Sequence, residues 1–233
     1  MSLPRLVFDG VTGGYGSAPV VREVSGQVAP GETLCVLGRN GTGKTTLMRL
    51  LMGYLRCWQG SVRLDGTSIE TLTTPARHAL GISYCPQEWP VFDDLSVRDN
   101  LTLMRPNRDL APFADCLARF PILARRLDQH AGTLSGGEKK LLSLTRGLAE
   151  ALPMMLLDEP SEGLAPIVVQ RIAKLLRYLR DTGATVLLAE QNMHFCLGIA
   201  SHATVIDKGQ IVYRDTIDAL RQDEAVKSRY LAL

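Results

Sequence analysis

The stretch GRNGTGKTT, residues 38–46, decides how this chain is built. It fits the phosphate-loop pattern Gly-x4-Gly-Lys-Ser/Thr. The apolar run at 33–37 before it predicts a buried strand, and residues 44–52 after it predict a helix. Glycines let the backbone curl so that successive N–H groups point at a polyphosphate, and the helix N-terminus adds partial positive charge. The stretch therefore predicts a nucleoside triphosphate site.

Two side chains of this loop have distinct expected roles. Lys44 can bridge the β- and γ-phosphates of the nucleotide, and the Thr45 hydroxyl can ligate Mg²⁺. The remaining contacts come mostly from the backbone. The residues expected to touch the nucleotide are Gly38, Asn40, Gly41, Thr42, Gly43, Lys44, Thr45 and Thr46.

Length and composition narrow the class of protein. The chain has 233 residues, which suits one large domain or one core with a subdomain. Its 26 basic and 24 acidic residues give a net charge of +2, so no nucleic-acid partner is expected. No apolar run approaches the ~20 residues that span a bilayer, and the N-terminus lacks the apolar core of a signal peptide.

The cysteines predict a cytosolic protein with reduced thiols. Their number is odd and their spacing does not match that of metal ligands, so we expect them to be mostly packing residues. The five are Cys35, Cys57, Cys85, Cys116 and Cys196.

Strand-like and helical segments alternate along the rest of the chain. This alternation predicts an α/β fold with a mainly parallel sheet. In the amphipathic helix at 167–179 we expect Ile167 to face inward and the basic residues, among them Lys174, to be solvated. A glycine-rich turn is expected at 13–16. The expected strands are 6–8, 24–28, 60–66, 82–85, 154–157, 185–189 and a hairpin of 203–206 with 210–213, and the other helices are 74–80, 111–120, 137–152 and the tail from Thr216.

Polar side chains stand where three of these strands end. Asp158 and Glu159 follow the strand at 154–157, at the end where α/β proteins bind ligands. Asp158 can hold Mg²⁺ through water, and Glu159 can polarise the water that attacks the γ-phosphate. Gln87 follows the strand at 82–85, where its amide could reach a Mg²⁺-bound water or simply be a polar loop residue. Gln191 follows the strand at 185–189.

Two further stretches have the form of ligand contacts. Tyr15 lies between glycines, where its ring could stack on an adenine or lie on the surface. In LSGGE, residues 134–138, Ser135 can cap the following helix. Gly136 and Gly137 have no side chains, so the N–H groups at the start of that helix stay accessible to an anion. LSGGE therefore predicts a second anion site, far in sequence from the first. The same residues would also suit an ordinary helix N-cap that contains glycine.

Taken in order, these motifs resemble those of the ATP-binding subunits of ABC transporters, nearly from end to end. GRNGTGKTT is similar to the Walker A loop, MMLLDE to Walker B and LSGGE to the family signature. Gln87 matches the Q-loop glutamine and Tyr15 the adenine-stacking aromatic. The resemblance implies a P-loop NTPase core with a mainly parallel sheet, an N-terminal antiparallel β subdomain and a helical subdomain. Residues 1–86 and 153–233 would form the core with its β subdomain, and residues 87–152 the helical subdomain.

Three further stretches resemble one group within that family. SEGLAP, LLAEQN and the tail DEAVKSRYLAL are similar to the ATPases that serve uptake of branched-chain amino acids, urea and short-chain amides. Gln191 replaces the usual switch histidine, so its amide can donate a hydrogen bond to a γ-phosphate but cannot carry a charge. Ala165 replaces the aspartate usual after Walker B, which puts communication across a dimer through that loop in question. Both replacements are also typical of this group.

The resemblance implies a mechanism that uses ATP and Mg²⁺. Two copies, or this chain and a sister ATPase, would form a head-to-tail dimer, with ATP between Lys44 of one subunit and Ser135, Gly136 and Gly137 of the other. The dimer would lie at the cytoplasmic face of the membrane, drive integral membrane permease subunits and serve an external solute-binding protein indirectly. We expect the permease to contact the loop at 87–92 through Trp89 and Phe92.

Other classes of protein share some of these motifs. A soluble ABC ATPase of DNA repair or chromosome organisation shares these motifs, but usually carries coiled-coil or zinc insertions. A P-loop kinase would use Lys44 but gives no reason for LSGGE, and Gln191 with Ala165 would also suit a nucleotide-binding regulatory module that does not hydrolyse ATP.

Overall fold

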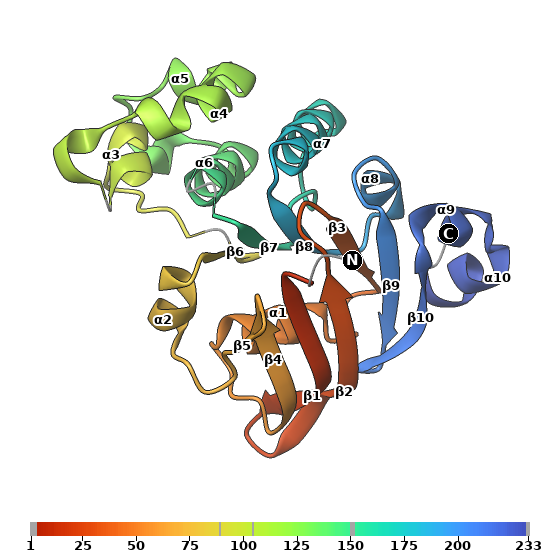
Figure 1. Cartoon of the computed structure of the whole chain (residues 1–233). Coiled ribbons are helices and arrows are strands. Elements are labelled where there is room, and N and C mark those ends of the chain that lie inside the picture. The colour runs from red at the N-terminus through yellow and green to blue at the C-terminus, as the bar shows by residue number, and fades with distance from the viewer. Residues whose placement is uncertain (1–3, 89, 104, 150–151, 232–233) are drawn as a thin grey trace.

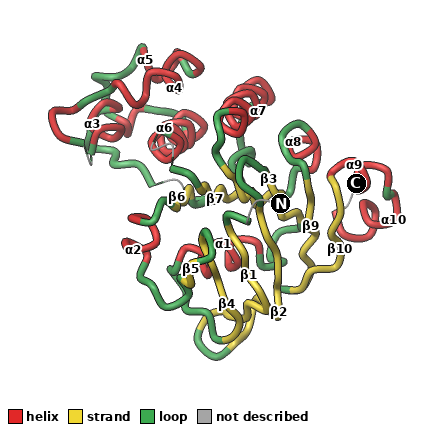
Figure 2. The backbone as a smooth tube through the Cα atoms, in the orientation of Figure 1, coloured by secondary structure: helices red, strands yellow, loops and turns green. Residues whose placement is uncertain are grey.

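The computed structural model describes residues 4–88, 90–103, 105–149 and 152–231. Within these ranges the strands form two sheets, and helix α1 (Lys44–Met52) lies between them (Figures 1 and 2). Helices α6 (Gly136–Leu148), α7 (Pro166–Asp181) and α8 (Met193–Leu197) lie beyond the larger sheet, on the side away from α1. The layers are therefore sheet, helix, sheet and helices.

The larger sheet carries the phosphate loop. Its strand order is β10-β9-β3-β8-β7-β6, and all neighbours are parallel except β9 and β10. This confirms the mainly parallel sheet, and it brings the carboxyl ends of β3, β8 and β7 to one edge. The strands are β3 (Thr33–Leu37), β6 (Ile82–Cys85), β7 (Met154–Asp158), β8 (Thr185–Glu190), β9 (His202–Asp207) and β10 (Gln210–Thr216).

Both faces of the central strands are buried, which explains their continuous apolar runs. Successive side chains of a strand point to opposite faces. On β3, Leu34 and Val36 belong to the core around α1, whereas Cys35 and Leu37 belong to the core under α6, α7 and α8. The sheet therefore separates two hydrophobic cores.

In the smaller sheet, the chain turns at a different position from the one predicted. Its order is β2-β1-β4-β5, and all of its pairs are antiparallel. The predicted turn at 13–16 is wrong, because β1 continues to Tyr15 and the chain reverses at Gly16 and Ser17. A Cβ on Gly14 would lie 2.1 Å from the Ala18 carbonyl oxygen, so this glycine serves close strand pairing. The strands are β1 (Leu6–Tyr15), β2 (Ala18–Val28), β4 (Gln59–Leu64) and β5 (Thr67–Ser68).

The remaining helices are short and mostly capped as expected. Ser135 accepts a hydrogen bond from the N–H group three residues later, as predicted for an N-cap, and Ser96 caps α3 in the same way. The cap of α2 is Thr73, directly before the helix that was predicted to begin at residue 74. No helix in the described ranges is long and apolar enough to cross a bilayer. The other helices are α2 (Thr74–Ala79), α3 (Val97–Thr102), α4 (Ala114–Arg119), α5 (Pro121–Ala124), α9 (Ile217–Gln222) and α10 (Glu224–Val226), with 3₁₀ turns at Pro106–Arg108, Ala111–Phe113 and Ala131–Thr133 and a π-helical turn at Lys227–Leu231.

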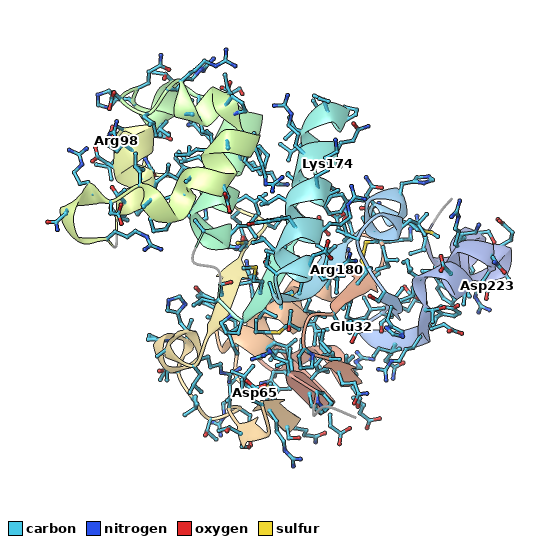
Figure 3. All side chains as sticks on the ribbon, turned by 45° about the horizontal axis from the view of Figure 1, so that its top comes forward. Glu32, Asp65, Arg98, Lys174, Arg180 and Asp223 are labelled. Atoms are coloured by element: carbon cyan, nitrogen blue, oxygen red, sulfur yellow. A yellow bond between two sulfur atoms is a disulfide. The ribbon has the colours of Figure 1, made fainter. Side chains whose placement is uncertain are left out.

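Helix α7 is amphipathic, but its buried face is narrower than predicted. Ile172 and Leu175 are buried, whereas Ile167, expected to face inward, is 57% exposed at the first turn. Lys174 and Arg180 project from the helix, as Figure 3 shows, and Arg180 also donates to the Ile199 carbonyl oxygen (3.2 Å). Part of the basic face therefore holds the segment that follows α8 (Met193–Leu197) rather than being fully solvated.

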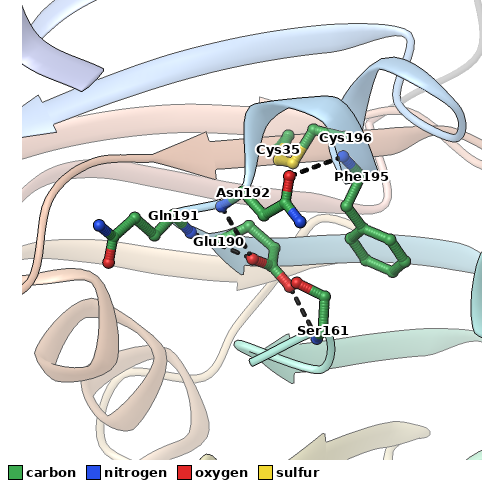
Figure 4. Close-up of a disulfide and its surroundings, with 7 residues drawn as sticks. All are labelled: Cys35, Ser161, Glu190, Gln191, Asn192, Phe195 and Cys196. Carbon is green, nitrogen blue, oxygen red and sulfur yellow. Dashed lines mark hydrogen bonds between the residues drawn. A yellow bond between two sulfur atoms is a disulfide. The ribbon is translucent and has the colours of Figure 1, made fainter. Parts of the chain in front are cut away.

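Two of the cysteines are not reduced, contrary to expectation. Cys35 on β3 and Cys196 on α8 form a disulfide, with their Cα atoms 6.4 Å apart (Figure 4). The two residues are 161 positions apart in sequence, so no local spacing indicates the pairing. Only the return of the chain from β8 into α8 places them together. Cys57 and Cys116 are free thiols.

A buried arginine holds the end of helix α1. Arg77 on α2 is 1% exposed and donates to the carbonyl oxygens of Leu50 (2.9 Å) and Leu51 (2.7 Å). It also donates to the carbonyl oxygens of Leu72 (3.1 Å) and Glu70 (2.9 Å). The guanidinium thus donates to carbonyls in the last turn of α1, where helical donors run out.

Replacing Arg77 by Met should destabilise the protein by about 3 kcal/mol, because several buried carbonyls lose a charged donor. For a chain of this length we expect a fall in Tm of roughly 6–12 °C in thermal unfolding followed by circular dichroism. Arg171→Met, on the exposed face of α7, is the control and should leave the Tm unchanged. Equal Tm values for the two variants would contradict this role for Arg77.

Candidate nucleotide site

The phosphate loop connects β3 to α1 at the carboxyl edge of the larger sheet. Gly43 precedes the helix with φ 111°, a conformation that favours glycine. A Cβ on Gly38 would lie 2.5 Å from the Ile206 carbonyl oxygen, so a larger residue would push the loop away from the sheet. Both glycines are therefore needed for the loop to curl against the N-terminus of α1.

Lys44 lies inside this loop and is 3% exposed. Its Nζ donates to the carbonyl oxygens of Gly38 (2.8 Å) and Arg39 (2.9 Å). Nζ also lies 3.0 Å from Oε1 of Glu159, and both side chains are almost fully buried. The ammonium group is thus fixed between the phosphate loop and the end of β7.

Asp158 has the properties of a magnesium ligand. It is fully buried at the end of β7, and its Oδ2 accepts a hydrogen bond from the Tyr84 hydroxyl (3.2 Å). Its Oδ1 is buried without a hydrogen-bond partner among the described residues. Burial raises the pKa of Asp158 to about 6, although the Thr45 and Tyr84 hydroxyls oppose the shift. An unpartnered carboxylate oxygen beside a hydroxyl suits Mg²⁺. This ion binds few protein oxygens, and phosphates and water complete its coordination shell.

Glu159 is the next residue and has a strained backbone, with φ 49°. The side chain of Glu159 contacts residues from two other segments of the site. Its Oε1 contacts Lys44, and its Oε2 accepts a hydrogen bond from Nε2 of Gln87 (3.2 Å). The Gln87 amide also donates to Glu162 (3.0 Å). The fold therefore brings together residues from the ends of β3, β6 and β7 that lie up to 115 positions apart in the sequence.

Tyr15 lies at the end of β1 and is 47% exposed. Its hydroxyl accepts a hydrogen bond from Arg49 of α1 (3.1 Å), and Arg49 also pairs with Glu88. The ring is thus held near the helix that follows the phosphate loop. Adenine stacking by Tyr15 remains a prediction.

Gln191 follows β8, and its exposed side chain lines a cavity of about 430 Å³ together with Glu159. Glu162 and Leu231 lie on the walls of the same cavity. In Figure 4 the amide of Gln191 points away from the Cys35–Cys196 disulfide, and its contact with a γ-phosphate remains a prediction.

Ser135 caps α6 through a reciprocal capping box with Glu138. The Glu138 N–H donates to the Ser135 hydroxyl (3.4 Å), and the Ser135 N–H donates to the Glu138 carboxylate (2.9 Å). Helix α6 packs into the core on the opposite face of the sheet from α1. Within one chain, Ser135, Gly136 and Gly137 therefore belong to a different face of the sheet from the phosphate loop.

Two charged residues in the site are not distinguished by the sequence. Lys140 on α6 donates to the carbonyl oxygens of Glu159 (2.8 Å) and Glu162 (2.5 Å), so α6 is tied to the loop after β7. Glu190, the last residue of β8, is 1% exposed and accepts backbone hydrogen bonds from two loops. Neither residue was among those expected at the site, and burial distinguishes both.

A metal site built from protein side chains alone is not present in the described ranges. No cluster of three or more His, Cys, Asp or Glu residues that could hold a metal ion occurs there. Asp158 is the one residue of this kind among the expected ligands.

The comparison with protein families decides the assignment. The family described as "ABC transporter" matches residues 21–162. The chain belongs to the ABC transporter family. It is an ATP-binding subunit of such a transporter and an ATPase, and such subunits bind ATP, dimerise and work with membrane permease subunits.

ABC transporter ATPases of different systems resemble the chain over nearly its whole length. A high-affinity branched-chain amino acid transport ATP-binding protein, BraG of Pseudomonas aeruginosa, is 38% identical over 230 residues, which covers 97% of this chain and 99% of BraG. The lipopolysaccharide export system ATP-binding protein LptB of Haemophilus influenzae is 34% identical over 232 residues, covering 97% and 96%. LptB of Escherichia coli K12 is 35% identical over 224 residues, covering 93% and 92%.

The fold matches solved ABC ATPases. A nucleotide-free ATP-binding cassette from an ABC transporter superposes with a TM-score of 0.84 at 24% identity, covering 96% of this chain and 97% of that one. An ATP-binding cassette in its ADP conformation superposes with a TM-score of 0.82, also at 24% identity, covering 97% and 98%. The expected ABC ATPase fold is therefore confirmed.

Proposed function

We propose that this ATPase drives an importer for branched-chain amino acids or related small amides, at the cytoplasmic face of the membrane. The proposal is supported by the 38% identity to BraG over almost the full length of both chains. Identities of 34–35% to LptB favour lipopolysaccharide export as the second candidate. Gln191 in the stretch LLAEQN adds support for the first candidate, because that stretch resembles the branched-chain group.

The position of the Glu159 carboxylate carries the catalytic part of the proposal. It lies 3.0 Å from the Lys44 ammonium and 3.2 Å from the Gln87 amide, between the group that binds phosphate and the group expected to reach the metal-bound water. We infer that Glu159 is the general base for the attacking water and that Gln191 donates a hydrogen bond to the γ-phosphate.

The metal-binding part of the proposal rests on three residues. Asp158 and the Thr45 hydroxyl would hold Mg²⁺, with Gln87 reaching it through a water. When bound, the ion would neutralise charge on the β- and γ-phosphates. The unpartnered Oδ1 of Asp158 is the observation that supports this assignment.

The nucleotide site is proposed to be shared between two subunits. Ser135, Gly136 and Gly137 form a glycine-rich helix N-terminus on the other face of the sheet from the phosphate loop of the same chain. A partner subunit facing this one would bring its phosphate loop to that helix end, whose N–H groups favour an anion. We infer that the partner is a second copy or a sister ATPase, and that a solute-binding protein acts through the permease.

A groove beside the site is the proposed docking surface for the permease. It has a volume of about 530 Å³ and lies between the end of α1, α2 and the region of α3 and α6. Exposed apolar side chains border it, with Tyr54 61%, Phe92 49% and Leu103 46% exposed. An apolar helix end of a permease would bury these side chains. Trp89, the other expected contact, lies outside the described residues.

The substrate class is tested by uptake and export assays in cells. A strain lacking this gene should lose uptake of radiolabelled leucine or of a short-chain amide, and the wild-type gene should restore it. Lipopolysaccharide should still reach the cell surface in the deletion strain. Normal uptake with accumulation of lipopolysaccharide inside the cell would instead favour the second candidate.

The docking surface is tested with Phe92→Ala in the same strain. Because Phe92 borders the groove and is not one of the residues proposed to bind nucleotide, we expect transport to fall at least about tenfold while hydrolysis by the purified ATPase stays within twofold. Val212→Ala, an exposed apolar residue on β10, is the control. Unchanged transport by the Phe92 variant would contradict docking at this groove.

A further inference from the structure

We propose that Glu190 is a positioning residue of the ATPase, because its buried carboxylate joins the loop that carries Glu159 to the loop that carries Gln191. The inference rests on the roles proposed above for Glu159 and Gln191. It assigns to Glu190 no contact with the nucleotide.

The place of Glu190 in the sheet puts it between these two loops. β8 lies between β3 and β7, and the register pairs Leu37 with Glu190 and Asp158 with Ala189. Glu190 therefore ends its strand at the edge where the phosphate loop leaves β3 and the catalytic loop leaves β7. At 1% exposure its carboxylate needs partners inside the protein.

Those partners are three backbone N–H groups from two loops (Figure 4). Oε1 accepts from the N–H of Ser161, after β7, at 2.9 Å. Oε2 accepts from the N–H groups of Gln191 and Asn192, after β8, at 3.1 Å each. Because each oxygen serves a different loop, a shift of either loop moves the carboxylate and weakens its bonds to the other.

These bonds favour a charged, fixed carboxylate. Burial raises the pKa of Glu190, and the donors at Ser161 and Asn192 oppose that shift. A carboxylate accepting backbone N–H groups makes charge-assisted hydrogen bonds, which are stronger than those between neutral groups. The link between the loops is therefore stronger than two neutral side chains could provide.

Both linked loops hold residues of the proposed reaction. Ser161 is two positions after Glu159, whose carboxylate contacts Lys44 and Gln87. Gln191 follows Glu190 directly and lines the same cavity as Glu159. Small displacements of reacting groups can reduce a rate by as much as about 100-fold. Glu190 is thus placed to fix the distance between the proposed base and the proposed γ-phosphate contact.

The kinetic test uses Glu190→Gln, which keeps the shape of the side chain. An amide has one accepting oxygen and one NH₂ group, so it can serve one loop but must turn a donor toward the N–H of the other. We expect kcat for ATP hydrolysis to fall roughly 10- to 100-fold, with KM for ATP changed less than about threefold. Asp218→Asn, an exposed acid on α9, is the matched control and should keep the wild-type kcat.

The structural test measures hydrogen–deuterium exchange in the full chain. In Glu190→Ala, peptides covering residues 159–164 and 190–196 should both exchange faster than in the wild type, while peptides from β1 and β2 should not change. In Glu190→Gln at least one of the two loops should exchange faster, which keeps the test available if the Ala variant does not fold. Faster exchange of 190–196 alone in Glu190→Ala, or a wild-type kcat in Glu190→Gln, would overturn the proposal.

The variants Glu159→Gln and Glu190→Gln separate the positioning role of Glu190 from the proposed role of Glu159 as the base. If Glu159→Gln keeps full activity, the assigned base is wrong, but the exchange of the two loops still tests whether Glu190 links them. If Glu159→Gln is inactive and Glu190→Gln matches the wild type in kcat and exchange, the base stands and the positioning role is wrong.

Discussion

Replacing Glu159 by Gln should reduce steady-state ATP hydrolysis by at least about 100-fold, because an amide cannot accept the proton of the attacking water. The substitution keeps the size of the side chain, so Lys44 and the phosphate loop should still hold ATP. We therefore expect the variant to bind ATP and to accumulate as a closed dimer. A phosphate-release assay measures the first effect, and size-exclusion chromatography with and without ATP measures the second.

The control for this result is a carboxylate nearby that is not proposed to act as a base. Glu162 also accepts a hydrogen bond from Gln87 but lies three residues farther along the loop, so Glu162→Gln should retain hydrolysis within about tenfold of wild type. Undiminished hydrolysis by Glu159→Gln would show that another group activates the water. Loss of ATP binding in that variant would show instead that Glu159 acts mainly through its ion pair with Lys44.

The second large effect is expected from Ser135→Arg. If Ser135 completes the site of a partner subunit, a bulky side chain there should block closure of two subunits around ATP and lower hydrolysis at least about 100-fold. ATP binding by the isolated subunit should change less than about threefold, because the phosphate loop of the same chain lies on the other face of the sheet. Fluorescent-nucleotide titration and the ATP-dependent dimer of the Glu159→Gln background give the two measurements.

Ser228→Arg, an exposed serine near the C-terminus, is the matched control and should dimerise normally. If Ser135→Arg weakens ATP binding by the isolated subunit as strongly as it lowers hydrolysis, the serine serves the site of its own chain. A Ser135→Arg variant that still forms the ATP-dependent dimer and hydrolyses ATP would exclude the shared site.

Several elements could be predicted because their signals are local. The strand at Thr33–Leu37 and the helix at Lys44–Met52 have the predicted bounds, since an apolar run, a glycine loop and a helical period are adjacent in sequence. The cap at Ser135 followed from the same kind of short-range pattern. The turn at 13–16 was wrong because glycine also serves close pairing of strands, and the sequence does not separate the two uses.

The sequence by itself determined the phosphate loop and the other motifs, because each depends on residues within a few positions of one another. The alternation of strands and helices along the chain determined the mainly parallel sheet. Only the tertiary structure decided that Glu159 touches both Lys44 and Gln87, that Cys35 meets Cys196, and that Glu190 is buried between two loops. The physical reason is that burial and the partners of a charge are set by which strands become neighbours in the sheet. Strand order brings together residues far apart in the chain, and no short stretch of sequence specifies it.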